Sequence, residues 1–373
     1  MHMRLRCFLL ALVCLLLLPP LSAQTKRRVI IDQDSRGPAT TDQQAILVLV
    51  QSPDTEVLGI TVVSGDQWRD EEVAHTLRLM EIIGRSDIPV VPGAVFPLIN
   101  RREGIKRWER LYGKVTYQGA WNEWKVGNYP GVWNRDKYYG PFEVPSLPEG
   151  NPTTKPADED AAHFLIRMVR QYPHEVTIYA GGPLTNLALA TAIDPQFAEL
   201  TQELVVMGGS IAPAVERLAQ RTSVRREFNF WWDPEATRIV LRAAWPKITI
   251  TTVDISIKTR LRQPMIDEIG KAQTAAAQYI AKWADEEFMW DELAAAAWLD
   301  PSIITKQEQL YMDINIDHGP GYGDTLVWAP GNQPGLGEQL VNIQTDLNTE
   351  QFYRMFIDLM TRPTPGAKTA DGS

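Results

Sequence analysis

The chain has 373 residues, of which 44% are hydrophobic and 22% are charged, and its formal net charge is -9. This is ordinary globular composition, with enough length for one large domain or two small ones. The acidic balance argues against nucleic acid as a partner, because phosphate binding requires a basic face. Wherever acidic groups gather locally, it favours a cation instead.

The first residues have the features of an export signal. Two arginines precede an apolar stretch over 7–18, and a Pro pair and a small-residue site ending at Ala23 follow. This pattern predicts a signal peptide over 1–23 and a periplasmic or extracellular protein. The stretch is too short for a stable membrane span, although a retained membrane anchor is the alternative. Cys7 and Cys14 both lie in it, so the mature protein would have no disulfide and no thiolate metal site.

Short runs rich in Val and Ile alternate with segments of helical spacing along most of the chain. The predicted strands are 29–31, 57–63, 88–91, 176–179, 204–207 and 248–253, and the predicted helices include 71–83, 161–172 and 234–244. Repeated strand and helix units predict an α/β fold with a mostly parallel, Rossmann-like open sheet flanked by helices. Sheets of this kind bind ligands at the carboxyl ends of their strands.

One stretch, 98–155, breaks this alternation and is rich in Trp, Tyr and Phe. We interpret it as an ordered insertion, because disordered segments are poor in aromatic residues. It either forms a lid that packs on the sheet or supplies an aromatic wall for a ring-shaped ligand, and the sequence does not choose between these. The tail over 364–373 is rich in Pro, Gly and Ala and is predicted to be flexible, which leaves one domain over 24–363.

Acidic residues gather where the first predicted strand ends. Asp32 and Asp34 close this strand, Asp42 opens the next helix, and Asp291 stands at the start of a later helix-like run. Hard divalent ions such as calcium take about six to eight oxygen ligands, which one loop rarely supplies. We therefore predict that the first loop shares an ion with a later acid. The alternative role for Asp291 is that of a helix cap.

Six motifs now make the chain recognisable: IIDQD at 30–34, SPDTEVLGITVVSGD at 52–66, GGPLTNLALA at 181–190, ELVVMGG at 203–209, EFNFWWDPEA at 227–236 and WDELAAAAWLDP at 290–301. Through them the chain resembles the inosine-uridine type nucleoside hydrolases, which are calcium-dependent enzymes that split the N-glycosidic bond of ribonucleosides. The resemblance covers nearly all of the predicted mature chain, and it implies the nucleoside hydrolase fold.

For the metal, the resemblance implies a Ca²⁺ site built from Asp34, Asp42, Asp291 and the backbone carbonyl of Thr185. Cleavage at an anomeric carbon needs a positioned nucleophile. We expect Asp34 to be the catalytic base that takes the proton of a metal-bound water. Asp32 is assigned a supporting role, hydrogen bonding within its own loop.

For the substrate, the resemblance implies that Glu227 and Asn229 hold the sugar, with Asp66, Thr41 and Trp290 lining the rest of the site. Four features depart from the family pattern, and one of them is that no Gly-Asn pair precedes Glu227. Thr41 replaces an acid in a loop that carries three extra residues, and Asp66 stands where the family usually has Asn. Trp290 replaces a His that is thought to protonate the leaving base, and an indole cannot supply a titrating proton.

A further candidate for this proton is His318, for which a structural role is preferred. The departures leave two functions open: a hydrolase of a ribonucleoside or related riboside, and a non-catalytic metal- and sugar-binding protein on the same scaffold. An aspartyl phosphatase is disfavoured, because Arg36 stands where its motif requires Thr or Val. We expect a small nucleoside or riboside as partner, no nucleic acid and no membrane span. The sequence leaves the base, the sugar and the oligomeric state open, a homo-oligomer included.

Overall fold

The computed structural model describes residues 26–115, 117–122, 139–211 and 226–368. The predicted signal peptide lies outside these residues, so its prediction stays untested. In the described part of the chain, no helix combines the length and the apolar composition that crossing a bilayer requires.

Within the described residues, one sheet of nine strands has the order β3-β2-β1-β4-β5-β6-β9-β7-β8. All neighbours from β3 to β9 are parallel, whereas β7 is antiparallel to both β9 and β8. The predicted, mostly parallel α/β sheet is thereby confirmed. The strands are β1 (Arg27–Gln33), β2 (Thr55–Val62), β3 (Val90–Pro92), β4 (Val176–Ala180), β5 (Glu203–Met207), β6 (Ile248–Thr251), β7 (Ile304–Ile314), β8 (Thr325–Trp328) and β9 (Gln339–Leu347).

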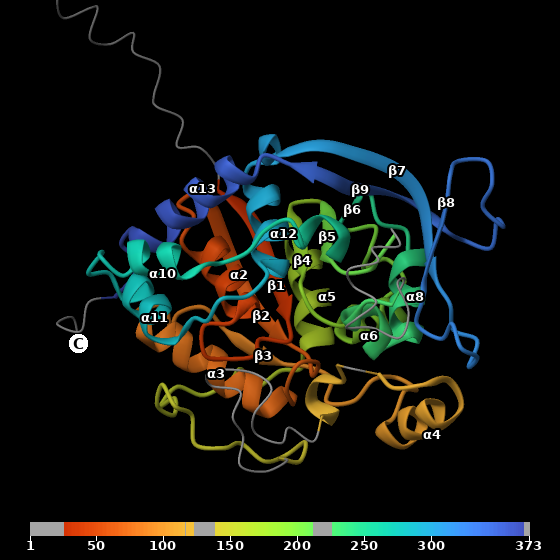
Figure 1. Cartoon of the computed structure of the whole chain (residues 1–373), viewed down its shortest axis with the longest axis horizontal. Coiled ribbons are helices and arrows are strands. Elements are labelled where there is room, and N and C mark those ends of the chain that lie inside the picture. The colour runs from red at the N-terminus through yellow and green to blue at the C-terminus, as the bar shows by residue number, and fades with distance from the viewer. Residues whose placement is uncertain (1–25, 116, 123–138, 212–225, 369–373) are drawn as a thin grey trace, which may run out of the picture.

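Helices cover both faces of this sheet, as Figure 1 shows. Successive side chains of a strand point to opposite faces, so Val29 and Ile31 of β1 join one apolar core and Ile30 joins the other. The first core contains side chains of α2 (Thr41–Val50), α3 (Arg69–Ile82), α9 (Val253–Ser256), α10 (Gln263–Ile269), α11 (Ala275–Trp283), α12 (Trp290–Leu299) and α13 (Thr349–Thr361). The second contains those of α5 (Ala161–Gln171), α6 (Thr185–Ile193) and α8 (Pro234–Arg242).

Every strand and helix predicted from the sequence is present, with its ends shifted by no more than two residues. The antiparallel part of the sheet, β7 to β9, was not predicted. Its longest strand, β7, begins ITKQEQ, and five consecutive residues of this run are exposed. Such a polar run lacks the apolar periodicity by which a strand is recognised.

The predicted insertion contains α4 (Arg102–Tyr112) and the short 3-10 helix η1 (Gly119–Trp121), and residues 116 and 123–138 of it lie outside the described part. The amide of Ala120 donates to the Gly65 carbonyl after β2 at 2.9 Å. Gly119 has φ +51, and a Cβ there would lie 2.2 Å from the same carbonyl, so the close approach requires glycine.

Two tryptophans join the insertion to α7 (Phe228–Trp232). Trp121 stacks on Trp232 with ring centroids 3.9 Å apart and an interplanar angle of 23°. Both rings are buried, in a small aromatic core that also contains Trp68 and Trp231. This part of the insertion packs as a lid does. Because α7 begins beside Glu227, the insertion also braces the segment predicted to hold the sugar.

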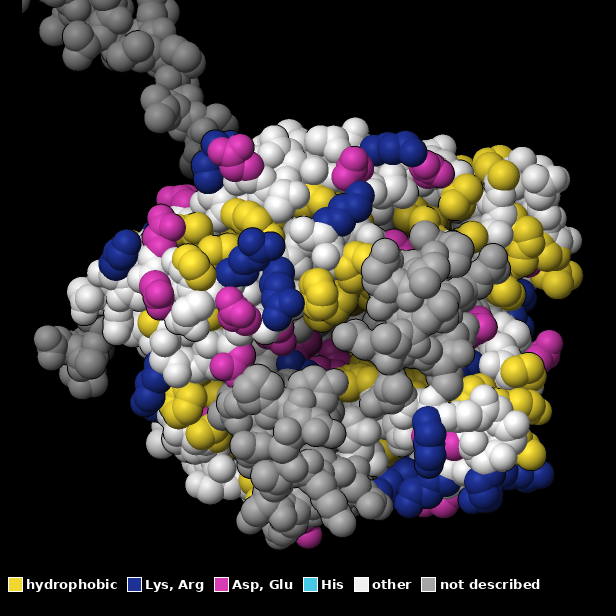
Figure 2. Space-filling view, viewed as in Figure 1, with side chains coloured by type: hydrophobic (Ala, Val, Ile, Leu, Met, Phe, Trp, Pro, Cys, Tyr) yellow, Lys and Arg dark blue, Asp and Glu magenta, His cyan; other side chains and the backbone are white. Residues whose placement is uncertain are grey.

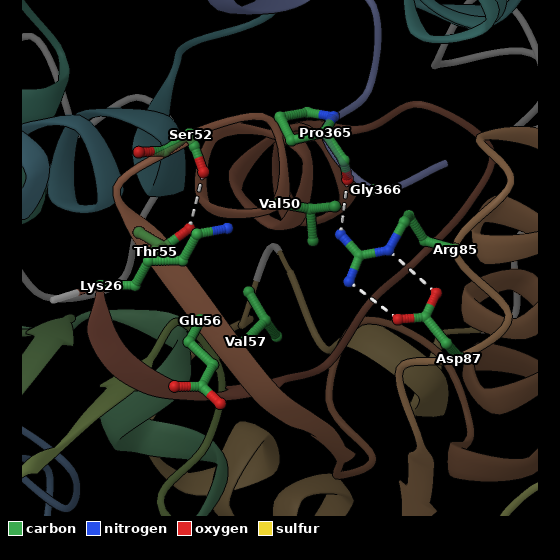
Figure 3. A pocket seen from close by; sticks show the side chains of 10 residues that line it. All are labelled: Lys26, Val50, Ser52, Thr55, Glu56, Val57, Arg85, Asp87, Pro365 and Gly366. Carbon is green, nitrogen blue, oxygen red and sulfur yellow. Dashed lines mark hydrogen bonds and ion pairs between the residues drawn. The ribbon is translucent and has the colours of Figure 1, made fainter. Parts of the chain in front are cut away.

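A cavity of about 260 Å³ lies at the amino ends of the parallel strands β1 and β2 (Figure 3). Arg85, on its wall, pairs with Asp87 and donates to the carbonyl of Pro365 at 2.9 Å. The amide of Lys368 donates to the Gly84 carbonyl at 2.9 Å. The first five residues of the predicted flexible tail therefore contact the body here, and its last five lie outside the described residues.

We predict that Trp121→Ala lowers the free energy of unfolding by about 3 to 5 kcal/mol, because it leaves a cavity against Trp232 in a closed aromatic core. Denaturant titration measures this change. Leu111→Ala is the control, since Leu111 is 65% exposed on α4 of the same insertion, and it is expected to change the unfolding free energy by less than about 0.5 kcal/mol. Similar values for the two variants would contradict the bracing role.

Candidate active site

The carboxyl end of β1 places Asp34 at the centre of the candidate site. Asp34 is buried, and its Oδ2 accepts the amide of Asp66 at 2.9 Å. A Cβ on Gly65 would lie 2.0 Å from that oxygen, and one on Gly182 would lie 2.7 Å from Oδ1. The loops after β2 and β4 thus close on Asp34 so tightly that both positions require glycine.

Asp32 lies two residues before Asp34, and its hydrogen-bond partners belong to other elements and not to its own loop as predicted. Its Oδ1 accepts hydrogen bonds from the Thr61 hydroxyl at 2.5 Å and from Asn186 Nδ2 at 2.8 Å. Burial raises the pKa of this carboxyl to about 7, against the two hydrogen bonds, which lower it. Through these hydrogen bonds Asp32 links β1 to β2 and to α6, next to the loop that carries Asp34.

Two helices begin at the site and contribute an acid each from their first turns. Asp42 lies in the first turn of α2 and Asp291 in that of α12. Helix N-termini favour negative charge. The hydroxyl of Thr41 lies between these helices, 3.1 Å from Asp291 Oδ2 and 2.6 Å from Glu292 Oε2. The residue predicted to touch substrate therefore joins the two helix ends. Asp291 does not cap α12, because the N-cap residue is Met289.

Burial and mutual repulsion raise the pKa of the central carboxyls. For Asp34 the causes are burial and then the charges of Asp66 and Asp42, among others. For Asp291 they are burial and then Asp42 and Glu292. Each group senses the others electrostatically, which shows that acids distant in the sequence are neighbours in the fold. Figure 2 shows acidic side chains at the bottom of a recess near the centre of one face.

One cation, Arg36, lies among these acids. Its Nη1 is 2.5 Å from Asp66 Oδ2 and its Nη2 is 3.4 Å from Glu287 Oε2. The side chain is buried, and its charge opposes the rise in pKa of Asp66 that burial causes. Nη1 also donates to the hydroxyl of Tyr117 in the insertion at 3.2 Å. Arg36 therefore connects the first loop, the second loop, the insertion and the segment before α12.

The predicted sugar-holding residues lie at the start of α7. Glu227 is its N-cap, and its carboxylate accepts the amides of Asn229 at 2.9 Å, Phe230 at 3.1 Å and Gly209 at 3.0 Å. The side-chain nitrogen of Asn229 donates to the Gly181 carbonyl at 2.6 Å, at the end of β4. Both side chains are held rigidly beside the strand ends. The first turn of α7 is thus fixed to the loops after β4 and β5.

The three remaining candidates, Thr185, Trp290 and His318, differ in their burial and in their contacts. Thr185 is buried at the start of α6, and its hydroxyl donates to Asp233 at 2.8 Å. Trp290 is half-buried as the first residue of α12, with its ring 4.8 Å from that of Phe288. His318 is exposed and stacks on Tyr322 with ring centroids 4.6 Å apart, in keeping with its preferred structural role.

The donor chemistry of this cluster fits a hard cation. Among the described residues, buried oxygens of Asp291 (Oδ1), Asp32 (Oδ2) and Gln33 (Oε1) have no hydrogen-bond partner. Oxygens of this kind are the ligands that a divalent ion such as calcium takes. Within the same residues, no group of three or more His, Cys, Asp or Glu side chains is arranged closely enough to hold a metal as it stands. Like charges repel, and protein donors such as Thr40 and Thr41 orient the carboxylates individually.

Sequence reasoning missed four residues of this site: Arg36, Tyr117, Glu287 and Glu292. Glu292 follows Asp291 directly, so the acid pair at the start of the predicted helix was the available signal. Arg36 belongs to the loop with three extra residues. Nothing in the local pattern assigns a partner to Tyr117, because its contacts depend on how the insertion folds back over the loop after β2.

Comparison with known proteins decides the family. The model of the inosine-uridine preferring nucleoside hydrolases matches residues 29–354, which is nearly the whole described chain. The chain belongs to this family. Its members are glycosidases that act on N-glycosyl compounds, so the predicted enzyme class and family are confirmed. This membership removes the phosphatase alternative.

Relatives of the chain include named nucleosidases. Uridine nucleosidase 1 of Arabidopsis thaliana is 32% identical over 255 residues, which cover 68% of this chain and 64% of the relative. An uncharacterized protein of Schizosaccharomyces pombe is 25% identical over 91% of this chain and 87% of its own length. A purine-preferring ribonucleoside hydrolase from Gardnerella vaginalis has the same fold, with a TM-score of 0.69 at 20% identity, covering 90% of this chain and 98% of that one.

We predict that the protein in EDTA becomes less stable as the pH rises from about 4 to about 7. Burial raises the pKa of Asp32 and of Glu287 to about 7, from ordinary values of 3.8 and 4.5. Such acids stabilise the fold only while they are protonated, so the effect is lost as the pH passes the folded pKa. The melting temperature, measured from pH 4.5 to 8 in EDTA, should fall by a few degrees. Calcium should raise it most at pH 8, and a rise across the window in EDTA would contradict the prediction.

Proposed function

We propose that the chain is a calcium-dependent hydrolase of the N-glycosidic bond of a ribonucleoside or related riboside. The observation that supports this most directly is the buried acid cluster at the carboxyl ends of β1 and β2, facing the segment that holds Glu227 and Asn229. Family membership supplies the reaction class. We also propose that the protein is exported, on the basis of the predicted signal peptide alone.

Four residues would hold the ion: Asp34, Asp42 and Asp291 through carboxylate oxygens, and Thr185 through its carbonyl. A bound calcium ion supplies positive charge that lowers the pKa of water and binds the vicinal hydroxyls of a ribose. The unpartnered Oδ1 of Asp291 and the mutual repulsion of the carboxyls support this set. A cation would relieve that repulsion.

The reaction requires a base, a held sugar and water in one place. Asp34 accepts the proton of the attacking water, and the amide of Asp66 fixes the orientation of its carboxylate. Glu227 and the side-chain oxygen of Asn229 accept hydrogen bonds from sugar hydroxyls, and contacts to the loops after β4 and β5 hold both side chains in place. Holding these groups in fixed positions lowers the entropic part of the activation barrier.

A substrate screen tests the proposed function. We expect at least one ribonucleoside or related riboside to release its base in the presence of calcium and to be stable in EDTA. Released base is followed by ultraviolet absorbance and released sugar by a reducing-sugar assay. If no riboside is cleaved with calcium present, the chain is a binding protein on this scaffold and the catalytic proposal is wrong.

Two variants test the proposed base and the proposed metal site, and Asp34 belongs to both. Asp34→Asn should lower kcat by about 10²- to 10⁴-fold, because the base is lost, while the protein stays folded. Asp42→Ala should abolish the rise in melting temperature on adding calcium, whether or not the protein is an enzyme. Asp317→Asn is the matched control, since Asp317 is exposed between β7 and β8, and should change neither. Full turnover by Asp34→Asn would exclude its role as the base.

A further inference from the structure

The leaving base needs a partner that the predicted site residues do not provide. When the bond from the anomeric carbon to nitrogen breaks, its electron pair stays on the base, which then carries negative charge. Trp290 has no titrating proton, and His318 is exposed and stacked on Tyr322. A preorganised hydrogen-bond donor at this point would stabilise the transition state, where the charge develops.

We propose that the hydroxyl of Tyr117, polarised by Arg36, donates a hydrogen bond to the departing base, so that the substrates are ribosides whose base leaves as an anion. This inference rests on the proposed function and assigns a further catalytic residue to it. Tyr117 would touch the leaving group, while Arg36 would act through Tyr117 as a positioning residue.

The contacts of Tyr117 orient its hydroxyl toward the loops of the site. Its oxygen accepts a hydrogen bond from Arg36 Nη1 at 3.2 Å, and it is also hydrogen-bonded to the carboxyl of Asp66. A carboxylate only accepts, so the Tyr117 hydroxyl donates its one hydrogen to Asp66 in this structure, and hydrogen bonds in a chain polarise one another. In the proposed step the departing base takes the place of Asp66 as the acceptor. The arrangement Arg36 to Tyr117 therefore points a strengthened donor at whatever replaces Asp66 as its acceptor.

The ring of Tyr117 lies beside the start of α7, while its hydroxyl contacts Arg36 in the loop after β1. It meets the ring of Phe228 edge to face, with centroids 4.8 Å apart. Phe228 lies between Glu227 and Asn229, which hold the sugar in the proposed function, and the amide of Asp66 binds Asp34. A riboside held between Asp34 and Glu227 would therefore lie next to Tyr117 and Phe228, and we place its base on that side.

The step balances without a second titrating residue. Water forms the new bond to the anomeric carbon and gives its proton to Asp34, while the bond to the base breaks and its electron pair moves to the base nitrogen. Tyr117 donates a hydrogen bond to this anion and keeps its proton, and the free base is protonated by solvent. Burial and the charge of Asp66 raise the pKa of Tyr117, so the hydroxyl stays protonated at neutral pH.

Contacts of the neighbouring residues in the insertion fix the position of Tyr117 relative to the site. Ala120, three residues later, is bonded to the Gly65 carbonyl, and Trp121 is locked against Trp232. Gly65 directly precedes Asp66. The insertion thus serves as a lid through its tryptophans and contributes to the wall of the site through Tyr117, which joins the two roles that the sequence left open.

Comparison of two substrates of the calcium-loaded enzyme tests the proposal. Tyr117→Phe should lower kcat for uridine by about 10²-fold, the usual loss when one such donor is removed, with KM changed by less than about 3-fold. The same variant should lower kcat for p-nitrophenyl riboside by less than about 3-fold, because p-nitrophenolate is already a stable anion and needs little help. The phenyl ring keeps its contact with Phe228, so the fold is retained.

The control is Tyr112→Phe, which makes the same chemical change at a residue of α4 that is 42% exposed, and it should leave both rates unchanged. An unfolded fraction lowers both rates by one factor, so the ratio of the two rates reports the chemistry alone. Equal losses for both substrates, or no loss for uridine, would overturn the role of Tyr117. Where the substrate screen finds another ribonucleoside cleaved in place of uridine, that nucleoside is used in this comparison. If the wild type cleaves no riboside at all, the proposed function itself fails, and this outcome is recognised before any variant is measured.

Discussion

Burying several carboxylates at one edge of a parallel sheet is the constraint around which the rest of the site is arranged. Removing a carboxylate from water is costly, and placing others beside it adds repulsion. The structure offsets these costs with the amide that binds Asp34, the helix starts that contribute Asp42 and Asp291, and the guanidinium of Arg36. A site so unfavourable for the free acids is well suited to attract a cation.

This arrangement is rigid because an apolar core packs on each face of the sheet. Each strand end is fixed by two apolar cores, so the loops that follow have little freedom. Gly65 and Gly182 press so closely on Asp34 that no side chain fits at either position. Asn229 is bonded to the end of β4, and Glu227 binds an amide after β5. Glu227 and Asn229, which we propose hold the sugar, are thus positioned by neighbours of the strands that position the acids.

Most of the fold and the centre of the site could be predicted from the sequence, because their signals are local. Apolar runs flanked by glycine and acid mark the buried strands, and Asp34, Asp42 and Asp291 each stand where such an element ends or begins. Features that depend on contacts between distant segments could not be predicted in this way. β7 is polar along half its length and becomes a strand only through pairing with β9. Arg36 and Tyr117 acquire their roles only when the first loop and the insertion meet over Asp66.

The two ends of the sheet have a consequence for how copies of this protein can associate. Its outermost strands, β3 and β8, have only three and four residues, and the Val90 carbonyl of β3 is already bonded to Ala157. On the other border, β8 pairs only with Tyr311–Ile314 of β7, so within the described residues the first part of β7 has no strand partner on that side. This part is exposed and carries the ion pair of Lys306 and Glu308, and charged side chains on an edge guard against strand addition. The charged residues at the start of β7 therefore protect the longest open edge of this sheet from pairing with another chain.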